Sequence, residues 1–425
     1  MLLRFRVANH RSIRDEQTLS FMAVPRRGEP KQLSTVRAAG VYGANASGKS
    51  NVLDALRWMI SAVQVSHRQW DPAGGIPHRH FKLSATGADT PSFYELDFLH
   101  ENVRYSYGFE VNGSQVLAEW LNSFPHGRTR KLFDRSGPGE IDFGRGLVGE
   151  TERIRRLTRP NSLYLSCAAS NNHPLLSSLH EHLTSHVLFA QHGEHDEKVR
   201  LLLAKTLLAD PAIAPTMNQL LRIADLGLEA AEIVEVPLPP RSEEILQHLS
   251  TIEDLGPFPP DTLDELRKEI RLRRPGGHAL RLREESAGTR VWLSLLGHSL
   301  AALGSGGMLV ADEIDSNLHP LLSSTLIRMF KDPVVNRTNA QLLFASHDTT
   351  LLGSMLDDQI LERDEVWFTE KDESGATRLY SLAEFTPRRD ENVERGYLQG
   401  RYGAVPYLSF DNIRELFTER PLSTP

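Results

Sequence analysis

The sequence predicts an α/β protein whose central sheet is mostly parallel, and three observations lead to this prediction. A glycine-rich segment at residues 43–50 lies between a short apolar run and an amphipathic stretch, which is the order strand, loop, helix. Helix-like and strand-like segments then alternate across residues 291–369. Finally, alternating apolar and polar positions predict two short strands joined by a turn at residues 3–20, and an antiparallel β arm, inserted after the first helix, at residues 93–121.

The composition predicts a globular protein of the cytoplasm. The chain has 425 residues, of which 40% are hydrophobic and 24% charged, and its length leaves room for two or three domains. No apolar run is long enough to cross a bilayer, and charge interrupts the first residues, so neither membrane contact nor a signal peptide is expected. The single cysteine, Cys167, excludes an internal disulfide framework. A net charge of -7 argues against a generally basic nucleic-acid binder, although a local basic patch remains compatible with it.

Changes of pattern along the chain predict four parts. Residues 1–150 form a first lobe that contains the glycine-rich segment and the β arm. Residues 151–275 show helical periods and a proline-rich stretch and are expected to be a helical insertion, which ends near Gly276 and Gly277. Residues 276–385 form a second lobe, and residues 386–425 a tail that is loop-like until residues 412–417. The elements expected in the second lobe are a helix at 291–303, a strand at 308–311, a helix at 320–330, a strand at 341–345, a helix at 351–356 and a strand at 365–369.

The glycine-rich segment matches the pattern G-x-x-x-x-G-K-[ST] of a phosphate-binding loop. Glycines allow the backbone N–H groups to turn tightly around phosphate oxygens, Lys49 supplies a positive charge for the β- and γ-phosphates, and Ser50 supplies a ligand for Mg²⁺. A glycine-rich surface turn is the alternative, but the helical spacing that follows disfavours it. The nucleotide-binding residues predicted here are Gly43, Ala44, Asn45, Ala46, Ser47, Gly48, Lys49, Ser50 and Asn51.

Two adjacent carboxylates follow the apolar run at residues 308–311. Phosphate-bound Mg²⁺ needs a nearby carboxylate, and Asp312 at the end of a strand is suited to that task. Glu313 is then left to polarise an attacking water. An ordinary strand end with solvated acids is the alternative for this segment taken alone. Together with the phosphate-binding loop, the pattern favours a magnesium and catalytic site.

Two further segments have the chemistry of a nucleotide site. His347 follows the apolar strand at residues 342–345, where it would donate to the γ-phosphate and hold the attacking water. Ser286 is the predicted N-cap, and Gly288 would let an oxygen-rich ligand approach the unpaired N–H groups of the helix that follows. A capped helix without a ligand explains this second segment equally well.

The full set of motifs resembles an ATP-binding-cassette ATPase of the SMC, RecF and OLD branch. Residues 43–50, 286–289 and 312–313, with Asp315 and His347, resemble the Walker A loop, the signature, Walker B, the D-loop and the switch histidine, in the order of that family. The resemblance implies an ABC-type P-loop ATPase head with ATP and Mg²⁺ as cofactors. It also implies a homodimer in which Ser286, Gly288 and Thr289 of one copy cap the γ-phosphate bound by the other. The sequence contains no sustained heptads, so a long coiled coil is not expected.

A closer resemblance is to bacterial anti-phage ATPases, the group that includes AriA of the PARIS system, the RloA proteins and the AbiL-type ATPases. It implies that Asn9, Arg11 and Ser12 lie at the nucleotide edge of the N-terminal sheet. The segments that carry this resemblance are residues 5–12, 285–289, 312–320, 363–368 and 396–406.

These observations lead to three hypotheses of function. The first is an ATPase that acts as sensor and scaffold of an anti-phage defence system and controls a separate effector such as a Toprim or RloB-type nuclease. The second is a DNA-repair or DNA-binding ATPase like RecF or SMC, suggested by three basic runs at residues 128–131, 153–159 and 267–274. Solvated helix faces are the simpler explanation of these runs. The third is a nucleotide-switched interaction protein that barely turns over.

Overall fold

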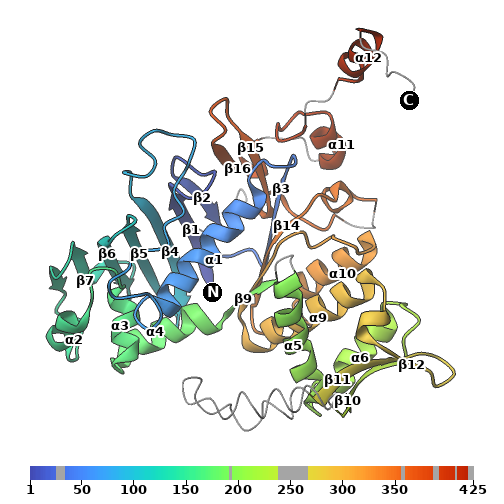
Figure 1. Cartoon of the computed structure of the whole chain (residues 1–425), viewed down its shortest axis with the longest axis horizontal. Coiled ribbons are helices and arrows are strands. Elements are labelled where there is room, and N and C mark those ends of the chain that lie inside the picture. The colour runs from blue at the N-terminus through green and yellow to red at the C-terminus, as the bar shows by residue number, and fades with distance from the viewer. Residues whose placement is uncertain are drawn as a thin grey trace. The chain divides into compact units, whose positions relative to one another are not determined.

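The computed structural model describes residues 1–24, 34–190, 194–237, 267–355, 359–385, 392–406 and 409–419 (Figure 1). The chain divides into two compact units. The first unit comprises Met1–Thr184 and Ala345–Pro425, and the second comprises Ser185–Phe344. No helix of the described residues is long and apolar enough to cross a membrane.

The first unit contains a seven-stranded antiparallel sheet with the order β2-β1-β4-β5-β6-β7-β8. The antiparallel β arm predicted from the alternating pattern is therefore confirmed. Aromatic and β-branched residues at every second position supply the buried face of such a sheet. The strands are β1 (Leu2–Ala8), β2 (Gln17–Ser20), β4 (Ser92–His100), β5 (Val103–Val111), β6 (Val116–Phe124), β7 (Arg130–Ser136) and β8 (Ile141–Phe143).

Helix α1 (Lys49–Val65) covers one face of this sheet (Figure 1). Its buried side chains recur with the helical period, and Trp58 stacks on Tyr94 of β4 with the ring centroids 4.6 Å apart. The apolar positions that predicted this helix are all buried, namely Val52, Leu53, Leu56, Met59, Ile60 and Val63. Burial of this apolar stripe holds the helix that begins at the phosphate-binding loop against the rigid sheet.

A second sheet has the strand order β16-β15-β3-β14-β13-β9. The pairs β15–β3, β13–β14 and β13–β9 are parallel, which agrees with the predicted mostly parallel sheet, whereas the edge strand β16 runs antiparallel to β15. The strands are β3 (Ala38–Gly43), β9 (Val187–Ala190), β13 (Met308–Ala311), β14 (Gln341–Ala345), β15 (Val366–Lys371) and β16 (Thr377–Ser381). The sequence predicted β13 and β14 with the bounds observed.

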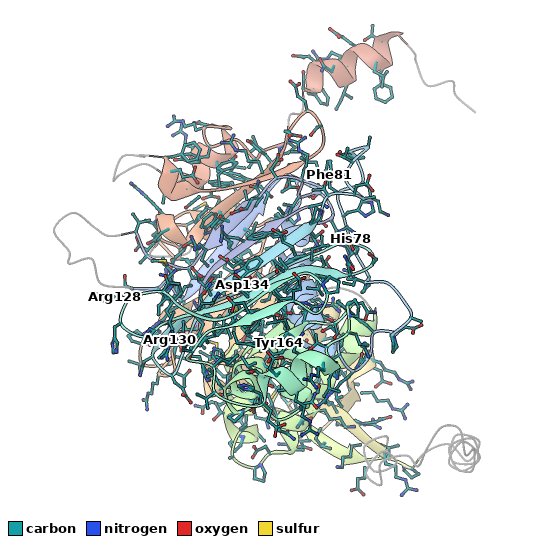
Figure 2. The ribbon with its side chains drawn as sticks, turned by 90° about the vertical axis from the view of Figure 1, so that its left-hand side faces the viewer. His78, Phe81, Arg128, Arg130, Asp134 and Tyr164 are labelled. Carbon is teal, nitrogen blue, oxygen red and sulfur yellow. The ribbon has the colours of Figure 1, made fainter. Side chains whose placement is uncertain are left out.

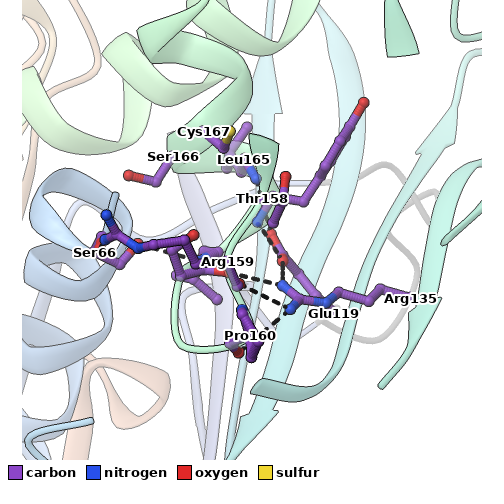
Figure 3. A network of polar contacts seen from close by, with 12 residues as sticks. Ser66, Glu119, Arg135, Thr158, Arg159, Pro160, Leu165, Ser166 and Cys167 are labelled. Atoms are coloured by element: carbon purple, nitrogen blue, oxygen red, sulfur yellow. Dashed lines mark hydrogen bonds and ion pairs between the residues drawn. The ribbon is translucent and has the colours of Figure 1, made fainter. Parts of the chain in front are cut away.

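A fully buried polar network joins the β arm to the helices that follow it (Figure 3). The carboxylate of Glu119, on β6, accepts hydrogen bonds from the backbone N–H groups of Tyr164 and Leu165, at 2.6 and 3.0 Å, and thereby caps helix α3 (Tyr164–Ser170). Arg135, on β7, lies 3.5 Å from this carboxylate and donates to the carbonyl oxygen of Ser162 at 2.8 Å. The network fixes the loop before α3 on the sheet.

Two further helices of the first unit flank α3 in the chain, and the loop before α3 also contacts α1. Arg159 donates to the carbonyl oxygens of Ser66, His67 and Trp70, so it satisfies backbone groups at the carboxyl end of α1. Helix α2 spans Thr151–Leu157 and α4 spans Pro174–Ser185. Cys167 is buried in α3 as a free thiol, in agreement with the expected absence of a disulfide framework.

The region expected to be a helical insertion is not helical throughout. Helices α5 (Glu194–Ala209) and α6 (Ala214–Ile223) match the helical periods, but β9 and the strands β10 (Ala230–Glu235) and β11 (Lys268–Arg273) also lie in this region. With β12 (Ala279–Arg281), β10 and β11 form a three-stranded antiparallel sheet. Periodicity alone cannot tell a run of four apolar residues such as β9 from a helical turn. Part of the proline-rich stretch lies outside the described residues, and the predicted domain boundaries stay a prediction.

The helices predicted after residue 276 are found in part, and the tail contains one helix more than predicted. In the second unit, α9 (Ala287–Ser305) and α10 (Pro320–Lys331) match their predictions. The helix expected at residues 351–356 is instead a single 3-10 turn, Thr349–Leu352, and residue 356 lies outside the described residues. The tail contains α11 (Val393–Leu398), which was not predicted, and α12 (Phe410–Glu419), which includes the predicted residues 412–417. Within the described ranges α9 is the longest helix, with 19 residues.

Candidate nucleotide-binding site

The loop that ends β3 and begins α1 has a backbone that only glycine can adopt at two positions. Gly43 has φ 153° and Gly48 has φ 114°. A Cβ atom at Gly43 would lie 2.4 Å from the carbonyl oxygen of Thr369, and one at Gly48 would lie 2.1 Å from Oγ1 of Thr377. The glycines therefore let the loop turn tightly beside β15 and β16, and they leave a cradle of backbone N–H groups of the kind that binds phosphate.

Lys49 is buried and its ammonium group is held inside this loop. Nζ donates to the carbonyl oxygens of Gly43, at 2.9 Å, and Ala44, at 3.2 Å. Nζ also lies 3.4 Å from Nδ1 of His347, which follows β14. Two residues separated by 298 positions, both predicted to act on the γ-phosphate, are thus neighbours in the first unit. The fold thus brings these two residues together, and their roles at the γ-phosphate stay predictions.

A relay of hydrogen bonds connects the loop to the N-terminal sheet. Nδ2 of Asn51 donates to Oγ of Ser12 at 2.6 Å, and Ser12 Oγ lies 2.7 Å from Oγ1 of Thr377. The Thr377 hydroxyl donates to the carbonyl oxygen of Ser47 at 2.9 Å, so its oxygen accepts from Ser12. Ser12 therefore lies beside the phosphate-binding loop, and its contact with nucleotide stays a prediction.

Next to this relay is an open hollow with a volume of about 540 Å³. Most of its lining is basic or imidazole-bearing, and no acidic side chain of the described residues lines it. His78 and Phe81, in the segment before β4, lie at one end of the antiparallel sheet (Figure 2). An anionic ligand would be favoured here by charge. The lining residues are Arg11, Ser12, Asn51, His78, Arg79, His80, Phe81, Lys82, Leu83, Lys371 and Gly375.

The wall formed by residues 78–82 was not predicted. The run His78-Arg79-His80-Phe81-Lys82 is a local signal, since it places four basic or imidazole side chains within five residues. It could have been found as a candidate anion site, but only the fold brings it beside Arg11 and Asn51.

Asn9 has a structural role at the edge of this region. Its side chain is buried, and Nδ2 donates to the carbonyl oxygens of Gly87, at 3.0 Å, and Thr90, at 2.6 Å. Its Oδ1 accepts from the backbone N–H of Phe81 at 2.9 Å. The amide thus holds the segment 81–90 in place, and the contact between Asn9 and nucleotide implied by the resemblance stays a prediction without support from this geometry.

In the second unit, the segment 286–289 begins α9 as predicted. Oγ of Ser286 accepts from the backbone N–H of Thr289 at 3.1 Å, so Ser286 is the N-cap. A Cβ atom at Gly288 would lie 2.6 Å from the carbonyl oxygen of Asn317, which shows how closely the turn after β13 approaches this helix end. The predicted signature residues and the segment around Asp315 are therefore close neighbours.

Asp312 and Glu313 follow β13 directly, at its carboxyl end. The backbone N–H of Asp312 donates to the carbonyl oxygen of Ala190 at 2.9 Å, which continues the pairing with β9. Glu313 has φ 51° and Asn317 has φ 58°, left-handed conformations that non-glycine residues adopt at a cost. Backbone strain of this kind is concentrated at functional sites, where surrounding contacts maintain it.

The residues present fit a phosphate and magnesium ligand. No group of three or more His, Cys, Asp or Glu side chains in the described ranges forms a ready-made metal cluster. Magnesium in nucleotide sites needs only one or two protein ligands because phosphate oxygens and water supply the others. A loop that excludes any Cβ at two positions and encloses a lysine ammonium group is suited to the phosphates, and Ser50 and Asp312 are of the right types for the cation.

Most cations of the basic runs at residues 153–159 and 267–274 pair with acids or backbone carbonyls, and in the run at 128–131 Lys131 does so. Arg159 is used at the end of α1, and Arg128 and Arg130 lie at the opposite end of the sheet from His78 and Phe81 (Figure 2). A run whose charges are neutralised by neighbours offers little attraction to a phosphate backbone. The ion pairs are Lys131 with Asp142, Arg153 with Glu150, Arg155 with Glu152, Arg271 with Glu269, Arg273 with Glu229 and Glu232, and Arg274 with Glu285.

The glycine-rich loop between a strand and a helix, with its enclosed lysine, defines a P-loop nucleotide-binding protein of the ATPase class. The chain belongs to the family described as "AAA domain, putative AbiEii toxin, Type IV TA system", whose profile matches residues 38–353. This match includes every predicted nucleotide and metal residue except Asn9, Arg11 and Ser12. Among curated protein sequences, none matches the chain.

Solved structures with a similar chain path include three SMC heads. A head bound to the C-terminal winged-helix domain of ScpA has a TM-score of 0.42 and 11% identity, and covers 89% of this chain and 97% of its own. The head of Thermotoga maritima has a TM-score of 0.39 and 12% identity, with coverages of 89% and 98%. A Pyrococcus furiosus head with an extended coiled coil, bound to the C-terminal domain of ScpA, has a TM-score of 0.40 and 10% identity, with coverages of 94% and 98%.

Proposed function

We propose that the chain binds and hydrolyses ATP with Mg²⁺ at a site built around residues 43–51. The observation that carries this proposal is the position of Lys49 Nζ inside a cradle that excludes side chains, 3.4 Å from His347. The triphosphate would accept hydrogen bonds from the backbone N–H groups of the loop and from Lys49. Ser50 and Asp312 would hold the cation, which neutralises charge on the phosphates.

The remaining predicted residues have separate tasks in this proposal. Glu313 would accept the proton of the attacking water, and His347 would orient that water and donate to the γ-phosphate. Ser286, Gly288, Thr289 and Asp315 would act in trans, because the resemblance implies that the signature of one copy caps the nucleotide of another. The active unit is therefore a homodimer in which ATP joins two copies.

Two substitutions test this site. Lys49→Ala removes the charge in the cradle, so binding of Mg·ATP measured by calorimetry should weaken by about tenfold or more. Glu313→Gln keeps the shape but removes the base, so phosphate release should be lost while ATP binding and the ATP-dependent dimer, measured by light scattering, persist. If Glu313→Gln changes neither turnover nor the lifetime of the dimer, the catalytic assignment is wrong.

At the level of the cell, we propose a sensor and scaffold of an anti-phage defence system that controls a separate effector, such as a Toprim or RloB-type nuclease. The support is the resemblance over residues 312–320 and 396–406 and the family description, which names a toxin of a toxin–antitoxin system. Cells carrying the chain and its neighbouring genes should resist phage, and Lys49→Ala should abolish this resistance. A chain that protects equally well with Lys49→Ala would contradict the role.

The alternative, a RecF- or SMC-like DNA-binding ATPase, has less support because most cations of the basic runs at residues 153–159 and 267–274 are paired within the protein. Its test is the ATPase rate with duplex DNA at low salt, where electrostatic binding is strongest. Stimulation that disappears as salt is raised would favour this alternative, and an unchanged rate would count against it.

A further inference from the structure

A half-buried carboxylate outside the predicted ATPase motifs contacts two arginines that line the hollow. Asp54 is on α1, four residues after Ser50, and its side chain is 13% exposed. Its oxygens accept hydrogen bonds from Nε2 of His10, at 3.0 Å, from Nη1 of Arg79, at 2.8 and 2.9 Å, and from Nε of Arg11. One carboxylate on the nucleotide-binding helix thus joins two other segments of the chain.

His10 contributes shape to this cluster rather than charge. Its ring is fully buried, and Nδ1 lies 2.7 Å from the hydroxyl of Tyr94. Because an ionised carboxylate only accepts, Nε2 carries a proton and Nδ1 accepts from Tyr94. Burial lowers the pKa of His10, which keeps the ring neutral. The charges that remain are one carboxylate and two guanidinium groups.

The turn that presents Arg11 is held in an unfavourable backbone conformation. Asn9 and Arg11 both have φ 50°, in the left-handed region. The backbone N–H of Arg11 donates to the carbonyl oxygen of Arg79 at 2.6 Å, and the two side chains meet again on Asp54. The two arginine-bearing segments are therefore fixed to each other by backbone and side-chain contacts, which is how such strain is maintained.

Both arginines keep unused donors. Within the described ranges, Arg11 uses only Nε and Arg79 only Nη1 for side-chain hydrogen bonds, and both side chains are 45% exposed. Both also line the hollow beside the phosphate-binding loop. A guanidinium group has five N–H donors in a planar fork, so each can bind a second anion while it stays on the first.

We propose that Asp54 is a positioning residue that holds Arg11 and Arg79 at the wall of the hollow, where their remaining N–H groups bind phosphate oxygens of the nucleotide. The inference rests on the proposed ATP-binding function. Fixing both guanidinium groups in the free protein lowers the side-chain entropy that is lost when the ligand binds. Because Asp54 lies on α1, a ligand bound by the two arginines would also be linked to this helix.

A set of variants that isolates this coupling tests the proposal. Calorimetric titration with Mg·ATP should show about tenfold weaker binding for Arg11→Ala with Arg79→Ala, because charge-assisted hydrogen bonds are lost. Asp54→Asn, which keeps the volume, should weaken binding less. Adding Asp54→Asn to the two arginine changes should have no further effect, since a residue that acts only through the arginines has nothing left to position. Asp142→Asn, which removes a surface ion pair with Lys131, is the matched control and should leave affinity unchanged.

Two results would overturn the inference. The first is an ATP affinity that is unchanged by the two arginine substitutions, whose exposed side chains make these variants informative even where Asp54→Asn does not fold. The second is an equal loss from Asp54→Asn with and without the arginines, which indicates a purely structural role. Failure of the proposed function itself would look different, because the unmodified chain would then bind no ATP and Lys49→Ala would change nothing.

Discussion

The first unit contains two clusters of carboxylate and guanidinium groups, one fully buried and one partly exposed, which differ in the hydrogen-bond donors that remain available. Glu119 and Arg135 are both fully buried, and every hydrogen-bonding group of these two side chains has a partner within the protein (Figure 3). Glu119 accepts from Tyr107, Tyr164, Leu165 and Arg135, and each nitrogen of Arg135 has a partner. Around Asp54, by contrast, the carboxylate is saturated but the arginines keep donors at the wall of a hollow.

This difference indicates a structural role for the first cluster and a ligand-binding role for the second. A cluster whose donors and acceptors are all paired within the protein can only stabilise the fold, and removing one partner leaves the other charge buried and uncompensated. A cluster that is fixed on one side and open on the other is preorganised for a ligand. We therefore expect substitutions in the first to change stability alone, and substitutions in the second to change both stability and nucleotide affinity.

The largest effect is expected from Arg135→Met. It leaves the Glu119 carboxylate buried without its counter-charge and frees the carbonyl oxygen of Ser162, so the free energy of unfolding should fall by about 3–5 kcal/mol. Urea unfolding measures this loss. ATP affinity of the folded protein should stay unchanged, and a change would break the distinction between the two clusters.

Asn9→Ala should have the next largest effect. It leaves the carbonyl oxygens of Gly87 and Thr90 and the N–H of Phe81 without their partner, at a cost of about 2–3 kcal/mol. Although Asn9 contacts Phe81, which lines the hollow, its side-chain amide makes all of its hydrogen bonds within the protein, as Glu119 and Arg135 do. Unfolding and ATP titration should therefore show lost stability with little change in affinity, whereas loss of affinity without loss of stability would restore Asn9 as a ligand.

Asp54→Asn should lower stability by about 1–2 kcal/mol at neutral pH because charge-assisted hydrogen bonds are lost. Burial alone would raise the pKa of the Asp54 carboxyl, but the hydrogen bonds from His10 and Arg79 outweigh it and hold the pKa well below its usual range. Asp54 therefore stabilises the fold above its unfolded pKa of about 4, and this contribution is lost as pH falls toward the folded pKa.

The check is urea unfolding of the unmodified chain and of Asp54→Asn at pH 7 and at pH 3. The difference between the two proteins should be largest at pH 7 and should shrink at pH 3. A difference that grows on acidification would show that the carboxylate is not stabilised by its partners.

The smallest effect is expected from Arg153→Ala, in the second basic run. Its ion pair with Glu150 joins side chains that are 75% and 70% exposed, so its removal should change the free energy of unfolding by less than about 0.5 kcal/mol. Binding of duplex DNA, measured by fluorescence anisotropy at low salt, should not change either. A marked loss of DNA binding would show that these paired runs are an interface after all.

The sequence by itself determined the local elements of this protein. The glycine positions of the phosphate-binding loop, the N-cap at Ser286, and the bounds of β13 and β14 follow from backbone conformations and from periods of two or 3.6 residues. These are properties of a few consecutive residues, so a single sequence contains them. The nucleotide loop and the carboxylates after β13 were predictable for the same reason.

Only the tertiary structure decided how these elements combine. The approach of His347 to Lys49, the pairing of β9 with β13, the use of the Asn9 amide and the cluster on Asp54 all join residues that are far apart in the chain. Such contacts depend on which segments pack together once apolar faces are buried, and no local period encodes that choice. The sequence therefore predicted the phosphate-binding loop, whereas only the tertiary structure shows that Arg11 and Arg79 lie near it and contact Asp54.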